Sequence, residues 1–519
     1  MLRINTFKTN GIEAIPVTLE VEIHSGLGIH VIGLEDAAVK ESLLRTITAM
    51  QTFGYHMPGK KIVINLAPAD LQKNGSGYDL PIALGIITAS GQVEMPDLSK
   101  YLIKGELGLD GSVREVPGAL TCAELASEKK YKGIILPATS AIEVSEIKDM
   151  EVYGIETLQD AIEILQEKSC SERMLVRNTK LFQRLTTRQK ETDAAKTKDF
   201  MDFSEIIGNE RAKRGLEIAA AGGHNVMMLG NPGSGKSLLA RATLGILPPM
   251  TTEEAVVTSK IYSVAGLGGL EPGLVRTRPF RSPHYSASLQ SIVGGGCQCG
   301  PGEVSLAHNG ILYLDDYSLI PASKLECVRA PMEDRKVTIS RLKSKVEYPA
   351  SFMLIAASNP CPCGYYGDGD GDRCTCKDGQ RQAYLKHLSG PIMDRIDIQL
   401  WLHPVNTKKL VNREKGEPSA IVAKRVEMAR NIQKRRFAGE GIFTNAEMNE
   451  KMLKRFCPLD EGCKSLMEHL INNLGLSARA YSRIIKVART IADLEKSKNI
   501  LKHHLAEAAS YTLLDKIDK

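Results

Sequence analysis

An eight-residue phosphate-loop pattern constrains this chain more than any other feature. Residues 230–237 read Gly-Asn-Pro-Gly-Ser-Gly-Lys-Ser and fit the pattern G-x-x-x-x-G-K-[ST]. The apolar run 226–229 predicts a buried strand before the loop, and residues 238–242 predict a helix after it. The free N–H groups and the dipole of such a helix would face the loop. The sequence therefore predicts an α/β unit that binds a nucleoside triphosphate.

The loop residues have separate expected roles. Lys236 is expected to reach the β and γ phosphates, and the Ser237 hydroxyl to complete a magnesium shell. ATP and Mg²⁺ are the expected cofactors. The residues expected to contact them are Gly230, Asn231, Pro232, Gly233, Ser234, Gly235, Lys236 and Ser237. The alternative is a glycine turn that binds nothing, and the flanking strand and helix argue against it.

Two later strand-like runs end in polar residues that suit the same site. The run Ile311–Leu314 is followed by Asp315 and Asp316. Asp315 is expected to ligate the magnesium ion, and Asp316 to polarise the attacking water, because phosphoryl transfer depends on positioning and electrostatics. The run 352–358 ends in Asn359, the expected sensor that orients water beside the γ phosphate. By residue type alone Asn359 could instead cap a turn.

The chain of 519 residues is long enough for about three domains. Residues 1–168 alternate strand-like and helical runs, which predicts a separate α+β domain. Residues 169–200 are polar and are expected to be a linker. Residues 201–405 carry the nucleotide motifs within strand and helix alternation, which predicts a parallel sheet flanked by helices. Residues 406–519 read as helical, so the fold class is α/β and multidomain.

The distribution of apolar residues argues against a membrane-spanning protein and against a secreted one. No apolar run approaches the roughly 18 residues that span a bilayer, and the N-terminus lacks a secretory apolar segment. A cytoplasmic protein without a membrane partner is expected.

Residues 401–519 carry 23 Lys+Arg against 14 Asp+Glu, within a chain of net charge +6. This basic segment suits nucleic-acid contact, although solvated basic helix faces are also common.

Four of the eleven cysteines form two C-x-C pairs. Cys361 and Cys363 form the first pair, and Cys374 and Cys376 form the second. Four thiolates could close a tetrahedral zinc site. Spacing of one residue within each pair is less typical than C-x-x-C, so free or redox-active thiols remain the alternative.

Several further blocks resemble the ComM/YifB family of magnesium-chelatase-like AAA+ ATPases, over nearly the whole chain. The blocks are Asp202-Phe-Ser-Glu-Ile-Ile-Gly-Asn209, Ala219-Ala-Ala-Gly-Gly-His-Asn225, Arg278-Pro-Phe-Arg-Ser-Pro-His284, Pro301-Gly-Glu-Val-Ser-Leu-Ala-His-Asn-Gly310, Asn359-Pro-Cys-Pro-Cys-Gly364, Ser389-Gly-Pro-Ile-Met-Asp-Arg-Ile-Asp397 and Ala488-Arg-Thr-Ile-Ala-Asp-Leu494. The resemblance implies a P-loop AAA+ core and a C-terminal helical lid. It also implies a homohexameric ATPase.

The resemblance assigns three further residues. Arg395 would be the arginine finger supplied to the neighbour's ATP, and Arg479 the second sensor. Both roles suit the fixed fork of a guanidinium. Ile207, in the first block, would contact the nucleotide. Relatives usually carry Asp-Glu where this chain has Asp315-Asp316, so the water-polarising carboxylate is one methylene shorter; slower hydrolysis or a compensating backbone shift is expected.

The N-terminal blocks 73–83 and 105–118 resemble the proteolytic domain of Lon-type proteases. That chemistry needs a serine activated by a lysine of depressed pKa. The nucleophile position falls on Gly77, beside Ser76, and the lysine position falls on Leu120. An apolar side chain cannot act as a base. A non-proteolytic Lon-like domain, useful for assembly or DNA contact, is therefore expected.

The resemblance implies an ATP-driven motor that moves DNA branches in homologous recombination, notably in natural transformation. The segment 337–349 predicts a hairpin, and its Arg341, Lys343 and Lys345 are candidates for phosphate contact. The alternative for these residues is a solvated basic hairpin. The alternative function is a chelatase- or MoxR-type ATPase that remodels a protein partner.

Overall fold

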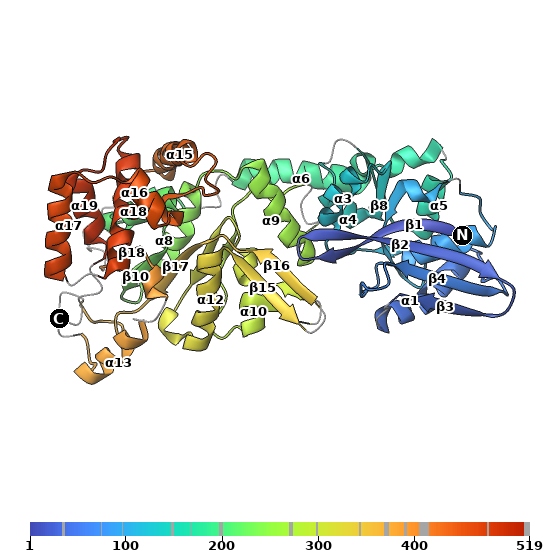
Figure 1. Cartoon of the computed structure of the whole chain (residues 1–519), viewed down its shortest axis with the longest axis horizontal. Coiled ribbons are helices and arrows are strands. Elements are labelled where there is room, and N and C mark those ends of the chain that lie inside the picture. Colours follow the sequence, from blue (N-terminus) through green and yellow to red (C-terminus); the bar gives the residue numbers. More distant parts are fainter. Residues whose placement is uncertain are drawn as a thin grey trace.

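Figure 1 shows a computed structural model of the chain as an elongated molecule, with the N-terminal sheet at one end and the C-terminal helices at the other. The structure describes residues 1–33, 37–73, 75–95, 97–146, 150–167, 169–196, 201–268, 273–296, 299–341, 344–367, 373–388, 392–403, 415–474 and 477–512. Among these residues, no helix combines the length and apolar character needed to cross a membrane.

The N-terminal part is built on a seven-stranded mixed sheet of order β3-β4-β2-β1-β5-β8-β9. Its strands are β1 (Leu2–Asn10), β2 (Glu13–His24), β3 (Gly28–Ile32), β4 (Lys61–Ala67), β5 (Tyr101–Ile103), β8 (Gly133–Pro137) and β9 (Glu151–Ile155). β1 pairs antiparallel with β2, and β2 with β4, while β5, β8 and β9 run parallel. The alternation of strands and helices that the sequence predicts for this part is thus present.

Helices cover this sheet. They are α1 (Ala37–Thr52), α2 (Asp79–Ala89), α3 (Cys122–Glu128), α4 (Ala138–Glu143) and α5 (Leu158–Leu165). The apolar sequence of α2 explains its place, since every residue from Asp79 to Ile87 is buried. α5 begins with a capping box, in which the Thr157 side chain accepts a hydrogen bond from the Asp160 N–H.

The central part contains a five-stranded parallel sheet of order β11-β14-β17-β10-β18. The strands are β10 (Val226–Gly230), β11 (Phe280–Arg281), β14 (Ile311–Leu314), β17 (Met353–Ser358) and β18 (Ile398–Leu402). All residues of β10, β14 and β17 are buried, as their unbroken apolar sequences require. Parallel strands end at one edge, so residues that follow β10, β14 and β17 gather there.

Helices and a hairpin surround the parallel sheet. The helices are α7 (Glu210–Gly222), α8 (Lys236–Ala242), α9 (Thr252–Val264), α10 (Leu289–Val293), α11 (Glu303–Leu306), α12 (Ala322–Asp334) and α13 (Asp378–Leu388). The predicted hairpin is present as β15 (Lys336–Arg341) and β16 (Ser344–Pro349). Its tip residue Lys343 and the side chain of Arg341 lie outside the described part, whereas Lys345 is exposed.

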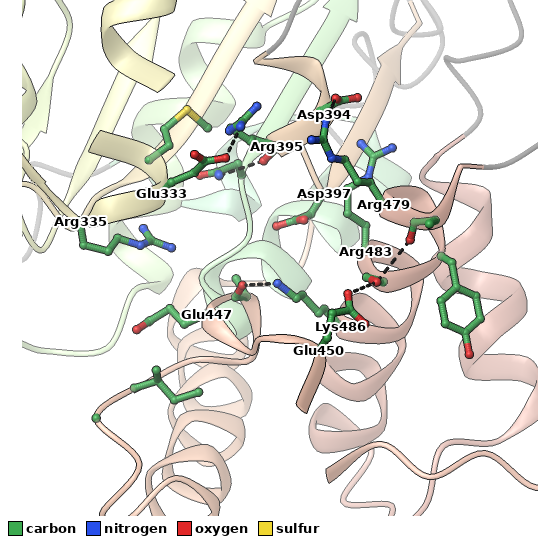
Figure 2. Close-up of a pocket in the computed structure, with 18 residues that line it drawn as sticks. Glu333, Arg335, Asp394, Arg395, Asp397, Glu447, Glu450, Arg479, Arg483 and Lys486 are labelled. Atoms are coloured by element: carbon green, nitrogen blue, oxygen red, sulfur yellow. Dashed lines mark hydrogen bonds and ion pairs between the residues drawn. The ribbon is translucent and has the colours of Figure 1, made fainter. Parts of the chain in front are cut away.

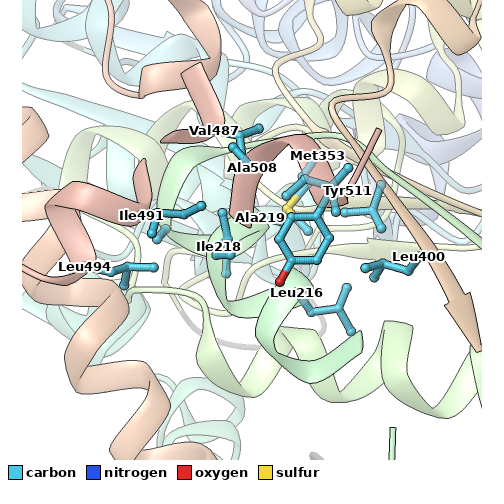
Figure 3. Packing of buried hydrophobic residues seen from close by; sticks show 14 of the residues in the cluster. Leu216, Ile218, Ala219, Met353, Leu400, Val487, Ile491, Leu494, Ala508 and Tyr511 are labelled. Atoms are coloured by element: carbon cyan, nitrogen blue, oxygen red, sulfur yellow. The ribbon is translucent and has the colours of Figure 1, made fainter. Parts of the chain in front are cut away.

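The C-terminal part is helical, as expected, with α15 (Ser419–Arg436), α16 (Glu450–Phe456), α17 (Glu461–Leu474), α18 (Ala478–Leu494) and α19 (Lys502–Ser510). Figure 3 shows Leu216 and Ile218 of α7 packing with Val487 and Ile491 of α18. The helical part and the parallel sheet therefore share one hydrophobic core.

Contacts also join the N-terminal part to the central one. Lys260 of α9 forms an ion pair with Glu124 at 2.5 Å, and the Gly118 N–H donates to the Ser263 carbonyl at 2.9 Å. Between the two parts, the expected linker 169–200 contains helix α6 (Lys180–Lys196). Leu181, Phe182 and Leu185 at the start of α6 pack against the N-terminal core, whereas the rest of its sequence is polar.

Candidate nucleotide site

The phosphate-loop pattern forms a turn between β10 and α8. Gly233 and Gly235 have φ values of +78° and +89°, and a Cβ at either position would meet open space. Two polar atoms of the turn, Asn231 Nδ2 and Ser234 Oγ, are buried and make no hydrogen bond within the described residues. A left-handed glycine turn with unsatisfied polar atoms at a helix start fits an anionic phosphate group.

Lys236 lies at the centre of the site. Its ammonium group donates to the carbonyls of Gly230 at 2.7 Å and Asn231 at 3.1 Å, and to Asn359 Oδ1 at 3.2 Å. Burial lowers the pKa of Lys236, while the charges of Asp315 and Asp316 oppose that shift. The structure thus brings the loop lysine and the predicted sensor into contact.

Ser237 and Asp315 meet beside the lysine. Ser237 Oγ donates to Asp315 Oδ2 at 3.2 Å, and it accepts a hydrogen bond from the Tyr313 hydroxyl at 3.1 Å. A hydroxyl and a carboxylate in contact are an oxygen pair that suits Mg²⁺. Tyr313, inside β14, is a residue of the site that the sequence reasoning missed, because its run was interpreted only as a buried strand.

Asp316 follows in a left-handed backbone conformation, with φ of +46°. It is exposed, and its N–H donates to Asp315 Oδ1 at 3.0 Å. This conformation is uncommon for residues other than glycine but is tolerated by aspartate.

The loop before α7 also reaches the phosphate turn. Ile207 is half-buried in this loop, and Asn209 donates through Nδ2 to the Ser234 carbonyl at 3.3 Å. Asn209 is the last residue of the family-like block 202–209, and the sequence predicts no role for it. The hydrogen bond places its loop next to the predicted nucleotide-contacting residues.

Arg395 and Arg479 lie elsewhere. They line a cleft of about 810 Å³, shown in Figure 2, whose lining includes none of residues 230–237. Arg395 pairs with Glu333, and Arg479 pairs with Asp394. The charged residues that line the cleft are Glu333, Arg335, Asp394, Arg395, Asp397, Glu447, Glu450, Arg479, Arg483 and Lys486. The structure brings the two predicted arginines into one cleft and separates them from the chain's own phosphate loop.

The turn that carries Arg395 is held from both sides. Arg483 of α18 donates to the Met393 carbonyl at 3.0 Å and to the Ile396 carbonyl at 2.6 Å. Asn225, just before β10, donates through Nδ2 to the Arg395 carbonyl at 3.0 Å. The start of the phosphate-loop strand and the C-terminal helices therefore both position this arginine.

The four predicted cysteine ligands also lie together. Cys361, Cys363, Cys374 and Cys376 place their sulfur atoms within 4.8 Å of one another. Cys361 lies two residues after Asn359 in the chain, so this cluster lies close to the nucleotide site.

The N-terminal part differs from a serine–lysine site at the two aligned positions. A Cβ on Gly77 would lie 2.7 Å from Lys104 Cε, while Ser76 donates its hydroxyl hydrogen bond to Glu106. Burial lowers the pKa of Lys104 to about 8. Leu120 is buried, and its N–H donates to Ser263 Oγ of α9 at 3.2 Å. The aligned lysine position is therefore part of the contact with the central domain.

Comparison with known families matches three parts of the chain to magnesium-chelatase families. Residues 202–410 match the family described as "Magnesium chelatase, subunit ChlI", residues 19–140 match "Subunit ChlI of Mg-chelatase", and residues 416–512 match "Magnesium chelatase, subunit ChlI C-terminal". A family of this type suggests ATPase activity with ATP and Mg²⁺.

Two of the individual relatives match over almost the full length, and a more distant one matches over part of it. "Uncharacterized protein YifB" of Salmonella typhimurium is 41% identical over 517 residues, covering 99% of this chain and 97% of the relative. "Competence protein ComM" of Haemophilus influenzae is 39% identical, covering 96% of this chain and 95% of the relative. "DNA replication licensing factor Mcm6" of Drosophila pseudoobscura pseudoobscura is 25% identical, covering 60% of this chain and 37% of the relative. The chain belongs to the ComM/YifB family of magnesium-chelatase-like proteins.

Proposed function

We propose that this protein is an ATP-driven motor that moves branched or single-stranded DNA during homologous recombination. The observation that carries the proposal is the convergence of Lys236, Ser237, Asp315 and Asn359 at the ends of three parallel strands. The name of the ComM relative, a competence protein, supports a role in the handling of incoming DNA. The relative named as a DNA replication licensing factor supports DNA as the substrate.

The residues of the site divide the work of phosphoryl transfer. Lys236 would hold the β and γ phosphates, and Ser237 and Asp315 would hold the metal. Mg²⁺, when bound, would neutralise charge that develops on the phosphate oxygens. Asp316 would polarise the attacking water, and Asn359 would orient it while its amide oxygen stays near the lysine. Each of these tasks is positional or electrostatic, as phosphoryl transfer requires.

The position of Arg395 and Arg479 supports a ring of several copies. Both arginines line a cleft apart from the chain's own phosphate loop. A guanidinium that acts on ATP from that place would act on the ATP of a neighbouring copy, which a closed ring provides. We propose a homohexamer in which each cleft delivers these two arginines to the next subunit. Their partners in the isolated chain, Glu333 and Asp394, would release them on assembly.

The hairpin β15–β16 is the proposed contact with DNA. It follows β14, which carries Asp315, and precedes β17, which leads to Asn359. Lys345 is exposed on it, and Lys336 pairs with Glu347 at 3.1 Å. A hairpin between the two strands of the site connects DNA contact directly to the residues that contact the phosphates. Lys345→Ala should weaken DNA binding and lower its salt dependence, because a phosphate contact is lost.

ATP hydrolysis tests the proposal. The purified protein is assayed without DNA and with duplex, single strands or four-way junctions, next to Lys236→Ala and Asp316→Asn. Stimulation by single-stranded or branched DNA, lost in both variants, is the expected result. Hydrolysis that no DNA changes would contradict a DNA motor. It would favour the alternative, a chelatase- or MoxR-type ATPase that remodels a protein partner, which the magnesium-chelatase family descriptions support.

A further inference from the structure

The four-cysteine cluster has the dimensions of a metal site. The sulfur of Cys361 lies 3.3 Å from that of Cys363 and 3.8 Å from that of Cys374, and Cys363 and Cys374 are 3.7 Å apart. A disulfide would need about 2.05 Å. Four thiolates at about 2.3 Å from a tetrahedral zinc ion lie about 3.8 Å from one another. The cluster therefore has the spacing of a tetrahedral thiolate cage.

Local hydrogen bonding supports the same interpretation. The Cys363 N–H donates to the sulfur of Cys376 at 3.3 Å. Such a contact favours a thiolate, and groups that hydrogen-bond to ligands orient metal sites. Cys361 is fully buried and the other three cysteines are half-buried, so the cage is closed on one side.

The two C-x-C pairs lie on segments that meet at the nucleotide site. The first pair follows Asn359 directly. A Cβ on Gly364 would lie 2.8 Å from Pro232 of the phosphate loop, so this segment packs closely against that loop. The second pair precedes α13, whose Tyr384 donates its hydroxyl to the Asn359 carbonyl at 3.1 Å. Both segments therefore contact Asn359 or the loop.

We infer that Cys361, Cys363, Cys374 and Cys376 bind one Zn²⁺ as four thiolates, and that this ion fixes Asn359 against the phosphate loop. Four protein ligands leave no open position, which makes the site structural rather than catalytic. The ion joins the segment that follows Asn359 to the segment that precedes α13. The positional part of this inference depends on the proposed nucleotide site, whereas the metal site itself does not.

Metal content tests the site without ATP or DNA. Full-length protein, purified under reducing conditions, is analysed for zinc and iron beside the double variant Cys374→Ser, Cys376→Ser. Cys327→Ser is the matched control, because Cys327 is also a half-buried free thiol, on α12. One zinc ion per chain in the native protein and the control, and nearly none in the double variant, is expected. Iron in place of zinc, or zinc that persists in the double variant, would overturn the inference.

Cobalt substitution of the native protein covers the case in which the double variant misfolds. Replacing the metal by Co²⁺ should produce a strong sulfur-to-cobalt charge-transfer band and the visible bands of tetrahedral geometry. Their absence would overturn the four-thiolate site. Chelator-stripped protein should also bind a fluorescent ATP analogue several-fold more weakly than the zinc form. If the zinc form and the chelator-stripped form bind the ATP analogue with equal affinity, the positional role of the ion is refuted, and the proposed ATPase activity is unaffected.

Discussion

Asp493 of α18 is the residue whose replacement should damage the C-terminal part most. Its side chain is 1% exposed. It accepts hydrogen bonds from Arg436 Nη1 at 2.7 Å, Arg489 Nε at 3.2 Å and Asn445 Nδ2 at 2.9 Å. Asp493→Asn keeps the shape of the side chain but removes the charge that the buried Arg489 and the partly buried Arg436 face. Removing one partner of a buried ion pair costs about 3–5 kcal/mol.

The loss should extend to the nucleotide-binding part. Asn445 also donates to Thr490 at 3.0 Å, and the Thr490 hydroxyl contacts His224 Nε2 at 2.8 Å. His224 in turn lies 3.1 Å from Asp397, two residues after Arg395. The network thus runs from α18 to the turn that carries the predicted arginine finger.

Thermal unfolding, followed by the emission of Trp401, measures the effect, because this single tryptophan lies on β18 beside β10. Asp493→Asn should lower the melting temperature by roughly 6 °C, because a cooperative unit of this size loses about 1.5 °C per kcal/mol. Asp394→Asn is the matched control, because it makes the same chemical change at an ion pair whose side chains are 67% and 48% exposed. Such a pair contributes about 0–1 kcal/mol. Equal melting temperatures for the two variants would refute the reasoning.

Four further outcomes are expected. Lys236→Ala should abolish detectable ATP hydrolysis, since it removes the cation next to Asn359; turnover near the native rate would contradict the site. Asp316→Glu should hydrolyse ATP at least as fast as the native protein if the shorter carboxylate of Asp316 limits the rate. A large fall in kcat would instead show that the left-handed backbone at this position suits aspartate only. Mixed rings of Lys236→Ala and Arg395→Ala subunits should hydrolyse ATP although neither variant does so alone. About a quarter of the subunit interfaces in such rings combine an intact Lys236 with an intact Arg395. If mixed rings do not recover ATP hydrolysis, an arginine finger supplied between subunits is excluded. Burial raises the pKa of Glu143 from 4.5 to about 7, so the folded state holds a proton that the unfolded chain releases. The free energy of unfolding should therefore fall as pH rises from 4.5 to about 7 and then level off. Thermal melts of Glu143→Gln across that pH range should not show this dependence.

The parts that were predictable from sequence are those fixed by local patterns. The buried strand before Gly230, the helix after Ser237 and the apolar run before Asp315 each follow from short stretches of residue type. Because parallel strands end at one edge, the contact between Ser237 and Asp315 could also be expected. The two C-x-C pairs made a four-thiolate cluster one of two possibilities, and the structure brings the four sulfur atoms together.

Other parts depend on contacts that no local pattern encodes. Helix α6 has only three large apolar residues, Leu181, Phe182 and Leu185, near its start, and its polar remainder led to the expectation of a linker. The shared cleft of Arg395 and Arg479 depends on how α18 packs against the core. Lys104 is buried beside Gly77 although neither its neighbours nor its charge predict burial. In each case tertiary packing decides the outcome.

The most direct test of the account is ATP-driven movement of a DNA branch. A junction with one fluorescently labelled strand is incubated with the protein, ATP and Mg²⁺, and release of that strand is followed over time. The account predicts release by the native protein that requires ATP and is absent with Lys236→Ala. ATP hydrolysis without any release of the strand, on every junction tested, would contradict it.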